Sequence, residues 1–175
     1  MSKDFFEHLL DQAGSHRKID QGVFLFRQDD PVKSVFAVIR GRVELTRYRP
    51  DGGSIVLQRA SEMTVLAEAS LYSETYHCDA VATLPSEIFE LPKAAFLSRL
   101  HGDQDFSTRW AAHLANEVRS ARSRCEILSR NTVADRLDGW LAWRDTLPAK
   151  GDWKNVAAQI GVSPEALYRE LAKRR

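Results

Sequence analysis

The sequence of 175 residues is poor in cysteine and has no clustered histidines. Its two cysteines, Cys78 and Cys125, form no CxxC or other metal-ligand spacing, and two are too few for a cluster held by four cysteines of one subunit. A disulfide between them and a pair of isolated thiols both stay open, and a reducing compartment favours the thiols. We expect no bound metal.

The sequence also lacks an apolar run of about 20 residues, the length that a transmembrane helix needs. Its first residues, MSKDFFEHLLDQ, are charged and amphipathic, unlike a secretory signal. No Ser/His/Asp ordering, glycine-rich phosphate loop or recognisable pair of catalytic carboxylates is present. We therefore predict a cytoplasmic protein that has no membrane partner and is not an enzyme.

Charge is nearly balanced over the whole chain, with a net value of +1, but it is unevenly distributed. Residues 119–175 carry 12 Lys and Arg against 7 Asp and Glu, whereas residues 1–118 carry 13 against 17. A basic C-terminal third attached to an acidic remainder is typical of a DNA-binding end joined to another module.

Residues 152–175 have the pattern of two short helices joined by a tight turn. Asp152 is a candidate N-cap of the first helix, and Gly161 ends that helix where a left-handed backbone is needed. Ser163 caps the second helix, and Pro164 takes its tolerant first position. This pattern predicts a helix-turn-helix, although an ordinary helical hairpin can carry the same signals.

The outward face of the second helix carries side chains suited to DNA. Glu165 and Arg169 are one turn apart, so both can enter one major groove, where arginine binds guanine and glutamate accepts a hydrogen bond from cytosine. The alternative is an ion pair within the helix. Basic residues at the end of the chain are suited to phosphate contacts. The candidate DNA-binding residues are Ser163, Glu165, Ala166, Tyr168, Arg169, Lys173 and Arg174.

The first half of the chain alternates in short apolar and polar steps that indicate β-strands. An amphipathic helix over residues 4–13 precedes them, and Pro92 opens another helix that runs through Leu100. Many short strands at this spacing predict a β-barrel or jelly roll. The predicted strands cover residues 23–26, 34–39, 42–48, 54–58, 78–83 and 86–91, with Gly41 between the second and third and a hairpin turn at 49–53.

A long helix is predicted over residues 104–130, followed by a helix over 133–146 and a linker over 147–151. The apolar positions of the long helix are spaced by three and four residues in turn, which is a heptad seam and favours self-association. A single amphipathic helix packed on its own domain would have the same spacing. The seam consists of Ala111, Leu114, Val118, Ala121, Cys125 and Leu128.

This order of parts resembles the Crp/Fnr family of bacterial transcription regulators. In the barrel the resemblance rests on residues 22–26, on Asp29-Asp30-Pro31 and on residues 36–43. Asp29 stands where the family has glycine, and aspartate tolerates a left-handed backbone better than most residues. The resemblance implies an α+β fold with a cyclic-nucleotide-binding-like sensor domain, a dimerisation helix and a small helix-turn-helix DNA-binding domain, over residues 1–103, 104–130 and 131–175.

Family members often bind cyclic AMP through Gly-Glu-(Leu/Ala), followed by Arg-(Ser/Thr)-Ala. In this sequence Glu68 stands at the ribose-binding carboxylate and Ala67 replaces the glycine. His77 stands at the phosphate-binding arginine, and an imidazole offers the phosphate fewer donors than a guanidinium. Asp79 adds a repelling charge. We therefore expect that cyclic AMP is not bound in the usual way.

The same stretch leaves another ligand as an alternative. Some relatives hold haem through histidine and cysteine, so the neighbouring His77 and Cys78 are a possible haem pair, or simply two residues of a barrel strand. We predict no cofactor, with cyclic nucleotide and haem as the alternatives. The candidate effector-pocket residues are Glu68, His77 and Cys78.

The resemblance also implies a two-stranded wing after the recognition helix, whereas the sequence ends at Lys173-Arg174-Arg175, so we expect a DNA-binding domain that lacks a wing. Pro164 stands where the family has a further base-reading arginine. The expected partners are double-stranded DNA and a second copy of the chain in a homodimer, with RNA polymerase as a further candidate. The alternative function is a cyclic-nucleotide-binding-like regulatory module that acts through protein contacts and has a degenerate DNA-binding end.

Overall fold

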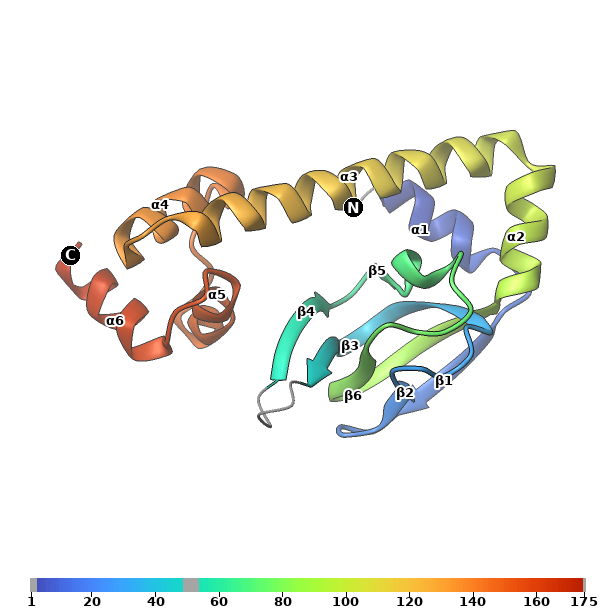
Figure 1. Ribbon diagram of the computed structural model, residues 1–175, viewed down its shortest axis with the longest axis horizontal. Helices are drawn as coiled ribbons and strands as arrows, with labels where there is room; N and C mark the ends of the chain where they lie inside the picture. The colour runs from blue at the N-terminus through green and yellow to red at the C-terminus, as the bar shows by residue number, and fades with distance from the viewer. Residues whose placement is uncertain (1–2, 49–53, 175) are drawn as a thin grey trace. The chain divides into compact units, whose positions relative to one another are not determined.

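The computed structural model of the chain describes residues 3–48 and 54–174 (Figure 1). The chain divides into two compact units, Met1–Leu114 and Ala115–Arg175, and each unit is described by itself. The predicted hairpin turn at 49–53 lies outside the described residues. Within the described ranges, no helix has the length and apolar character that crossing a membrane requires.

The first unit is built around an antiparallel sheet in the order β1-β6-β3-β4, with β2 paired to β6 and β5 paired to β3. This arrangement confirms the predicted jelly-roll-like fold of the α+β class. In the described part of this unit, three helical segments accompany the sheet before the long helix. The elements are α1 (Lys3–Leu10), β1 (Ser15–Ile19), β2 (Phe24–Phe26), β3 (Ser34–Tyr48), β4 (Ser54–Ala60), β5 (Thr64–Leu66), η1 (Glu68–Ser70), β6 (Asp79–Pro92) and α2 (Lys93–Gly102).

Strand β3 corrects the prediction that Gly41 separates two strands. The strand is continuous, and Gly41 bends it with a φ of +91° while its register with β6 shifts between Arg40 and Arg42. The backbone N–H of Arg42 donates to the Ser86 hydroxyl at 2.9 Å, which replaces a missing ladder bond at the bend. Glycine therefore marks a kink in a strand here, as it often does at barrel corners.

Strands β1, β5 and β6 also differ from the prediction. Strand β6 is one element of 14 residues, whereas two strands were predicted over this range. The prediction missed β1 because its sequence, SHRKI, has only one buried residue, and it missed β5 because that strand has three residues. Polar edge strands and very short strands carry little alternation, so only pairing with neighbours reveals them.

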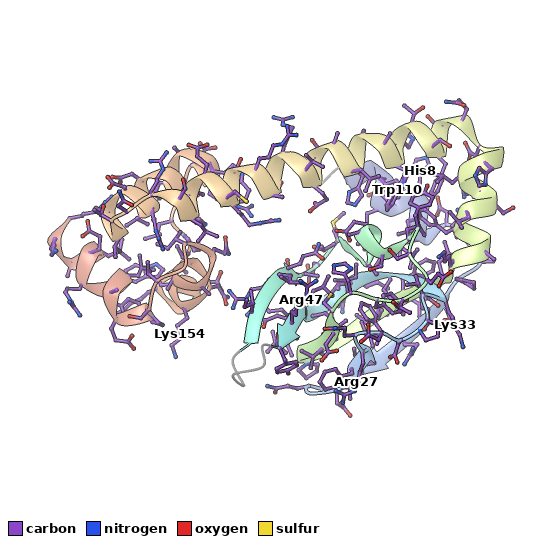
Figure 2. All side chains as sticks on the ribbon, in the orientation of Figure 1. His8, Arg27, Lys33, Arg47, Trp110 and Lys154 are labelled. Carbon is purple, nitrogen blue, oxygen red and sulfur yellow. The ribbon has the colours of Figure 1, made fainter. Side chains whose placement is uncertain are left out.

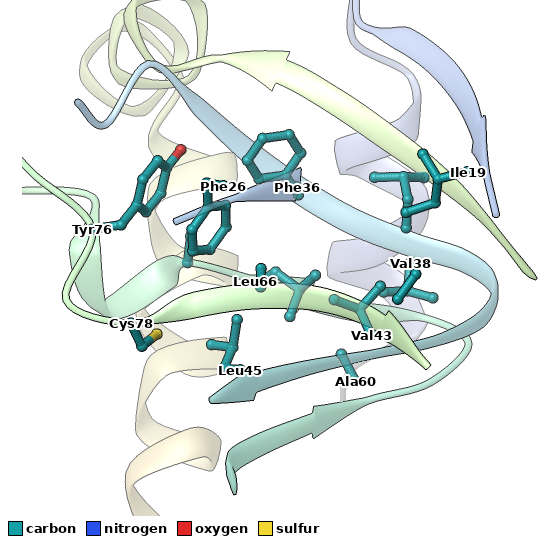
Figure 3. Close-up of a cluster of buried hydrophobic side chains, with 14 of the residues drawn as sticks. Ile19, Phe26, Phe36, Val38, Val43, Leu45, Ala60, Leu66, Tyr76 and Cys78 are labelled. Atoms are coloured by element: carbon teal, nitrogen blue, oxygen red, sulfur yellow. The ribbon is translucent and has the colours of Figure 1, made fainter. Parts of the chain in front are cut away.

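Two hydrophobic clusters lie on opposite faces of the sheet because neighbouring residues of a strand point to opposite sides. Phe36 and Val38 of β3 belong to the cluster inside the barrel, which Figure 3 shows, and Val35 and Ala37 belong to the other. The second cluster packs α1 and α2 on the sheet. Its largest side chains are Phe5, Phe6, Phe89, Phe96, Phe106 and Trp110.

Helix α3 (Gln104–Ser129) follows α2 and contributes residues to both compact units. It begins after Asp103, whose carboxylate accepts the backbone N–H of Phe106 at 3.0 Å and an N–H of Arg99 at 3.2 Å. These donors hold the pKa of Asp103 below its ordinary value. The helix is therefore capped where the chain leaves α2.

The second unit contains α4 (Val133–Arg144), η2 (Lys150–Asp152), α5 (Trp153–Gln159) and α6 (Pro164–Lys173). Thr132 caps α4 through its hydroxyl, which accepts the backbone N–H of Asp135 at 3.0 Å. A third hydrophobic cluster joins the helices. Its buried members are Ile127, Leu137, Trp140, Val156, Ala157, Ile160 and Leu167.

Candidate functional site

The turn between α5 and α6 has the geometry that its sequence predicts. Gly161 adopts a φ of +66°, and the backbone N–H of Val162 donates to the carbonyl of Ala157 at 2.9 Å. The Ser163 hydroxyl accepts the backbone N–H of Ala166 at 3.2 Å, and proline occupies the first turn of α6. The predicted left-handed glycine and serine cap are thus confirmed.

Arg136 of α4 fastens this turn to the rest of the second unit. Its guanidinium donates to the carbonyls of Ile160 at 3.2 Å and Gly161 at 3.1 Å, which follow α5. It also donates to the carbonyl of Arg130 at 2.8 Å. A helix end leaves carbonyls without partners inside the helix, and one half-buried arginine serves them here. Sequence reasoning missed this residue, because its partners lie 24 and 25 residues away.

The exposed face of α6 carries most of the predicted DNA-binding side chains. Ser163, Glu165, Arg169 and Lys173 are exposed, and Ala166 is half-buried. The N–H of its own backbone and the Ser163 hydroxyl lower the pKa of Glu165, so this carboxyl is ionised at neutral pH. Across residues 3–48 and 54–174, no ion pair joins Glu165 to Arg169.

Two of the predicted DNA-binding residues, Tyr168 and Arg174, contact other helices of the unit. Tyr168 is half-buried, and its ring centroid lies 5.7 Å from that of Trp153. The Arg174 guanidinium pairs with the carboxylates of Asp138 and Glu170 and donates to the carbonyl of Ala134 at 3.1 Å. These two side chains therefore hold α6 on α5 and α4, and they are not free in the way that the sequence suggested.

The barrel contains the second candidate site, in the loop between β5 and β6. Ala67 adopts a φ of +66° immediately before the short helix η1, in the position where the resemblance implies glycine. Glu68 is half-buried at the start of η1. The backbone thus makes the left-handed turn that glycine makes most readily, but with a Cβ that glycine lacks.

His77, Ser70 and Arg47 meet beside this loop. The Ser70 hydroxyl oxygen lies 2.7 Å from Nδ1 of His77, and the Arg47 guanidinium donates to the His77 carbonyl at 3.0 and 3.3 Å. Burial, and then the charge of Arg47, lowers the pKa of His77, so the imidazole is neutral at pH 7. Figure 2 shows Arg47 on the hairpin of β3 and β4. Sequence reasoning named His77 but missed Ser70 and Arg47.

The side chains of Cys78 and Asp79 are buried in the barrel. The Cys78 side chain lies in the cluster inside the barrel, and burial raises the pKa of its thiol to about 11. The buried Asp79 carboxylate accepts the backbone N–H of Gln28 at 2.6 Å. A buried protonated thiol next to an exposed imidazole does not provide two converging ligands for haem iron. Among the described residues, no group of three or more His, Cys, Asp or Glu side chains is arranged to hold a metal ion.

A left-handed turn at Asp29 supports the same end of the barrel. Its φ is +69°, as the sequence predicts for an aspartate in the place of glycine. The Asp30 carboxylate accepts the backbone N–H of Arg27 at 2.7 Å, and the backbone N–H of Asp29 donates to the carbonyl of Tyr76 at 2.9 Å. The loop that precedes His77 is therefore tied to this turn.

The seam residues of α3 differ in how much of their surface is exposed to solvent. Val118 keeps 48% of its surface exposed and Leu128 keeps 43%. Ala111 and Cys125 are also exposed, whereas Leu114 and Ala121 are half-buried. An apolar stripe with exposed valine and leucine side chains has the composition of a helix–helix interface.

Comparison with known proteins identifies a family and several solved structures of similar fold. Residues 16–103 match the family of the cyclic nucleotide-binding domain. None of the curated proteins matches the chain. Among solved structures, FixK2 from Bradyrhizobium japonicum aligns with a TM-score of 0.75 at 17% identity, over 93% of this chain and 84% of that chain.

Two further structures are similar over nearly the whole chain. CLP of Xanthomonas campestris, described as a c-di-GMP-responsive global regulator, aligns with a TM-score of 0.68 at 19% identity, over 97% of this chain and 90% of that chain. The catabolite activator protein of Thermus thermophilus aligns with a TM-score of 0.59 at 25% identity, over 99% and 83%. At the lower identities the likeness concerns the fold alone.

Proposed function

Because the chain belongs to the cyclic nucleotide-binding domain family, we propose that it is a transcription regulator of the Crp/Fnr type that binds double-stranded DNA as a homodimer. Its structural neighbours are regulators of this type. The observation that carries the proposal is the exposed pair of Glu165 and Arg169 on the capped helix α6, with no ion pair between them in the described part of the chain.

The chemistry of this pair suits the major groove. Arg169 can donate two parallel hydrogen bonds to guanine, and the ionised Glu165 can accept one from the amino group of cytosine. The two residues are four apart, so they share one face of the helix. Helix α6 acts as the recognition helix of a helix-turn-helix, and it is supported by the buried Val156 and Ala157 of α5 and by Ile160 just after that helix.

Replacement of Arg169 by alanine tests the proposal. We expect the affinity for the cognate DNA fragment to fall at least about thirtyfold, because the homodimer loses one bidentate base contact in each half-site and each contact contributes about 1–3 kcal/mol. Discrimination should relax at one base pair of each half-site. The measurement is a gel shift on genomic fragments, followed by a titration of the selected fragment at fixed salt.

Arg40→Ala is the matched control, since Arg40 is exposed on β3 of the first unit and its loss removes the same charge. This variant should bind DNA like the unmodified protein. A chain that shifts no fragment even at low salt would contradict the proposal and would favour a regulatory module that acts through protein contacts.

The barrel serves in this proposal as a sensor that does not hold cyclic AMP in the usual way. A cyclic phosphate binds best to a guanidinium that is free to donate two parallel hydrogen bonds. Between residues 66 and 79 the chain has no arginine, and Arg47 already donates to the His77 carbonyl. The neutral His77 ring, hydrogen-bonded to Ser70, offers a weaker substitute.

Dimerisation through α3 is the second testable part of the proposal. Val118→Asp should raise the dimer dissociation constant at least about tenfold, because association would bury an unpaired carboxylate. Light scattering over a concentration series measures the change. Ala112→Asp places the same charge on an exposed position of α3 outside the seam and should leave the dimer intact. A monomeric unmodified chain at all concentrations would contradict this part.

A further inference from the structure

The second unit has a cavity that the proposed function does not use. Its volume is about 430 Å³, and its lining residues are Lys150, Trp153, Tyr168, Leu171 and Ala172. Ligand pockets in proteins span about 300–1,000 Å³, so this cavity suits a ligand of one or two rings. All five lining residues belong to the unit Ala115–Arg175, so the cavity is formed within one compact body.

Two aromatic rings form the walls of the cavity. The indole N–H of Trp153 donates to the carbonyl of Pro148 at 2.9 Å, which fixes the ring and leaves it with no unpaired donor. The planes of Trp153 and Tyr168 are inclined at 44°, so the rings form a wedge and not a stack. An aromatic ligand in such a wedge can meet the face of one ring and the edge of the other, which are both favourable contacts.

The charge of the cavity lining favours a negatively charged ligand. Lys150 is the one charged residue among those that line it, and no carboxylate does so. Lys150 is exposed, so its ammonium group can turn to a negative group at the mouth. Leu171 and Ala172 of α6 add apolar surface to the lining of the cavity.

We propose that this cavity binds a small planar aromatic monoanion, such as an aromatic carboxylate. The ring packs against the sides of Trp153 and Tyr168 that line the cavity, and the carboxylate pairs with the Lys150 ammonium. This site is separate from the barrel loop around Glu68 and His77. Because Tyr168 and Leu171 belong to α6, the ligand contacts the helix proposed to read DNA, but its binding does not require that proposal to hold.

Calorimetric titration of the full chain with 2-naphthoate, without DNA, tests the site. We expect one site per chain with a dissociation constant of about 0.1–1 mM, in keeping with a ligand of this size. The uncharged 2-naphthamide, which has the same shape, should bind at least about threefold more weakly because it loses the ion pair. Equal affinity for the acid and the amide would overturn the assigned charge preference.

Three variants locate the binding. Ala172→Phe should abolish it, since Ala172 is exposed at the cavity and a phenyl ring there fills the space without entering the core. Lys150→Gln should weaken it about threefold to tenfold. Lys154→Gln removes a nearby exposed charge that does not line the cavity and should leave the affinity unchanged.

Thermal unfolding of each variant verifies that the second unit is folded. Naphthoate binding that persists in folded Ala172→Phe, or no binding by the unmodified chain up to about 10 mM, would overturn the proposal. Because the readout contains no DNA, a failed gel shift and a failed titration are independent results.

Discussion

Replacing Gly41 by alanine should destabilise the first unit by about 2–5 kcal/mol, the sum of a left-handed backbone and an overpacked contact. A Cβ at this position would lie 2.3 Å from the Ser86 hydroxyl oxygen and 2.4 Å from the Pro85 carbonyl oxygen. The Cα of Ser86 would be 2.7 Å away. Two of these neighbours are backbone atoms of β6, so the strand itself has to move.

Gly22→Ala separates the two contributions. Gly22 also has a positive φ, +86°, but an added Cβ there meets nothing within 4 Å. This variant should lose only the backbone part, about 1–2 kcal/mol. Hydrogen exchange of the β3 and β6 amides measures both free energies in the folded chain. Equal losses in the two variants would show that the close contact at Ser86 contributes nothing.

Arg136→Met should lower the free energy of unfolding of the second unit by about 2–4 kcal/mol, because hydrogen bonds from a charged donor each contribute about 1.5–3 kcal/mol and partly overlap. Methionine keeps the apolar stem of the side chain and removes its donors. The carbonyls of Arg130, Ile160 and Gly161 then lose their shared partner.

Urea unfolding followed by tryptophan fluorescence measures this effect, since Trp140, Trp143 and Trp153 all lie in the second unit. Arg122→Met is the control, because Arg122 is exposed on α3 and its loss removes the same charge. An ordinary surface substitution changes the free energy of unfolding by less than about 0.5 kcal/mol. A loss of that size in Arg136→Met would contradict the role of Arg136 in fastening the turn between α5 and α6.

Local chemistry explains which parts of the structure could be predicted from the sequence. The left-handed Gly161, the Ser163 cap and the left-handed Asp29 each depend on residues within three or four positions of one another. The alternation in the middle of β3 agrees with the burial of Val43 and Leu45, whereas it does not account for the five consecutive buried residues at the start of the strand. These features need no knowledge of distant parts of the chain.

Features that depend on distant partners could not be predicted. Gly41 signals a break in a strand, and only the pairing with Ser86 turns that break into a bend. The sequence predicts that Arg174 is a free cation, whereas in the structure it pairs with Asp138, which is 36 residues away. The sequence predicts that Tyr168 is exposed, whereas in the structure its ring contacts that of Trp153.

The candidate effector loop shows the same limit. His77 follows from the family pattern, but its contact with Arg47 joins a residue of β3 to a residue of the loop before β6, 30 positions later. A signal for Arg47 was present in the sequence. Continued alternation from Val43 and Leu45 would place Arg47 on the inner face of the barrel, where an arginine is unusual.

Helix α6 is fastened near both of its ends by residues that do not lie on its outer face. Arg136 holds the turn that precedes it, and Arg174 joins its last turn to α4. Between these anchors, Glu165 and Arg169 take no part in the core. In the proposed function, base preference and folding stability therefore depend on different side chains, so the DNA sequence that is read could diverge in evolution, or be redesigned, without loss of the fold.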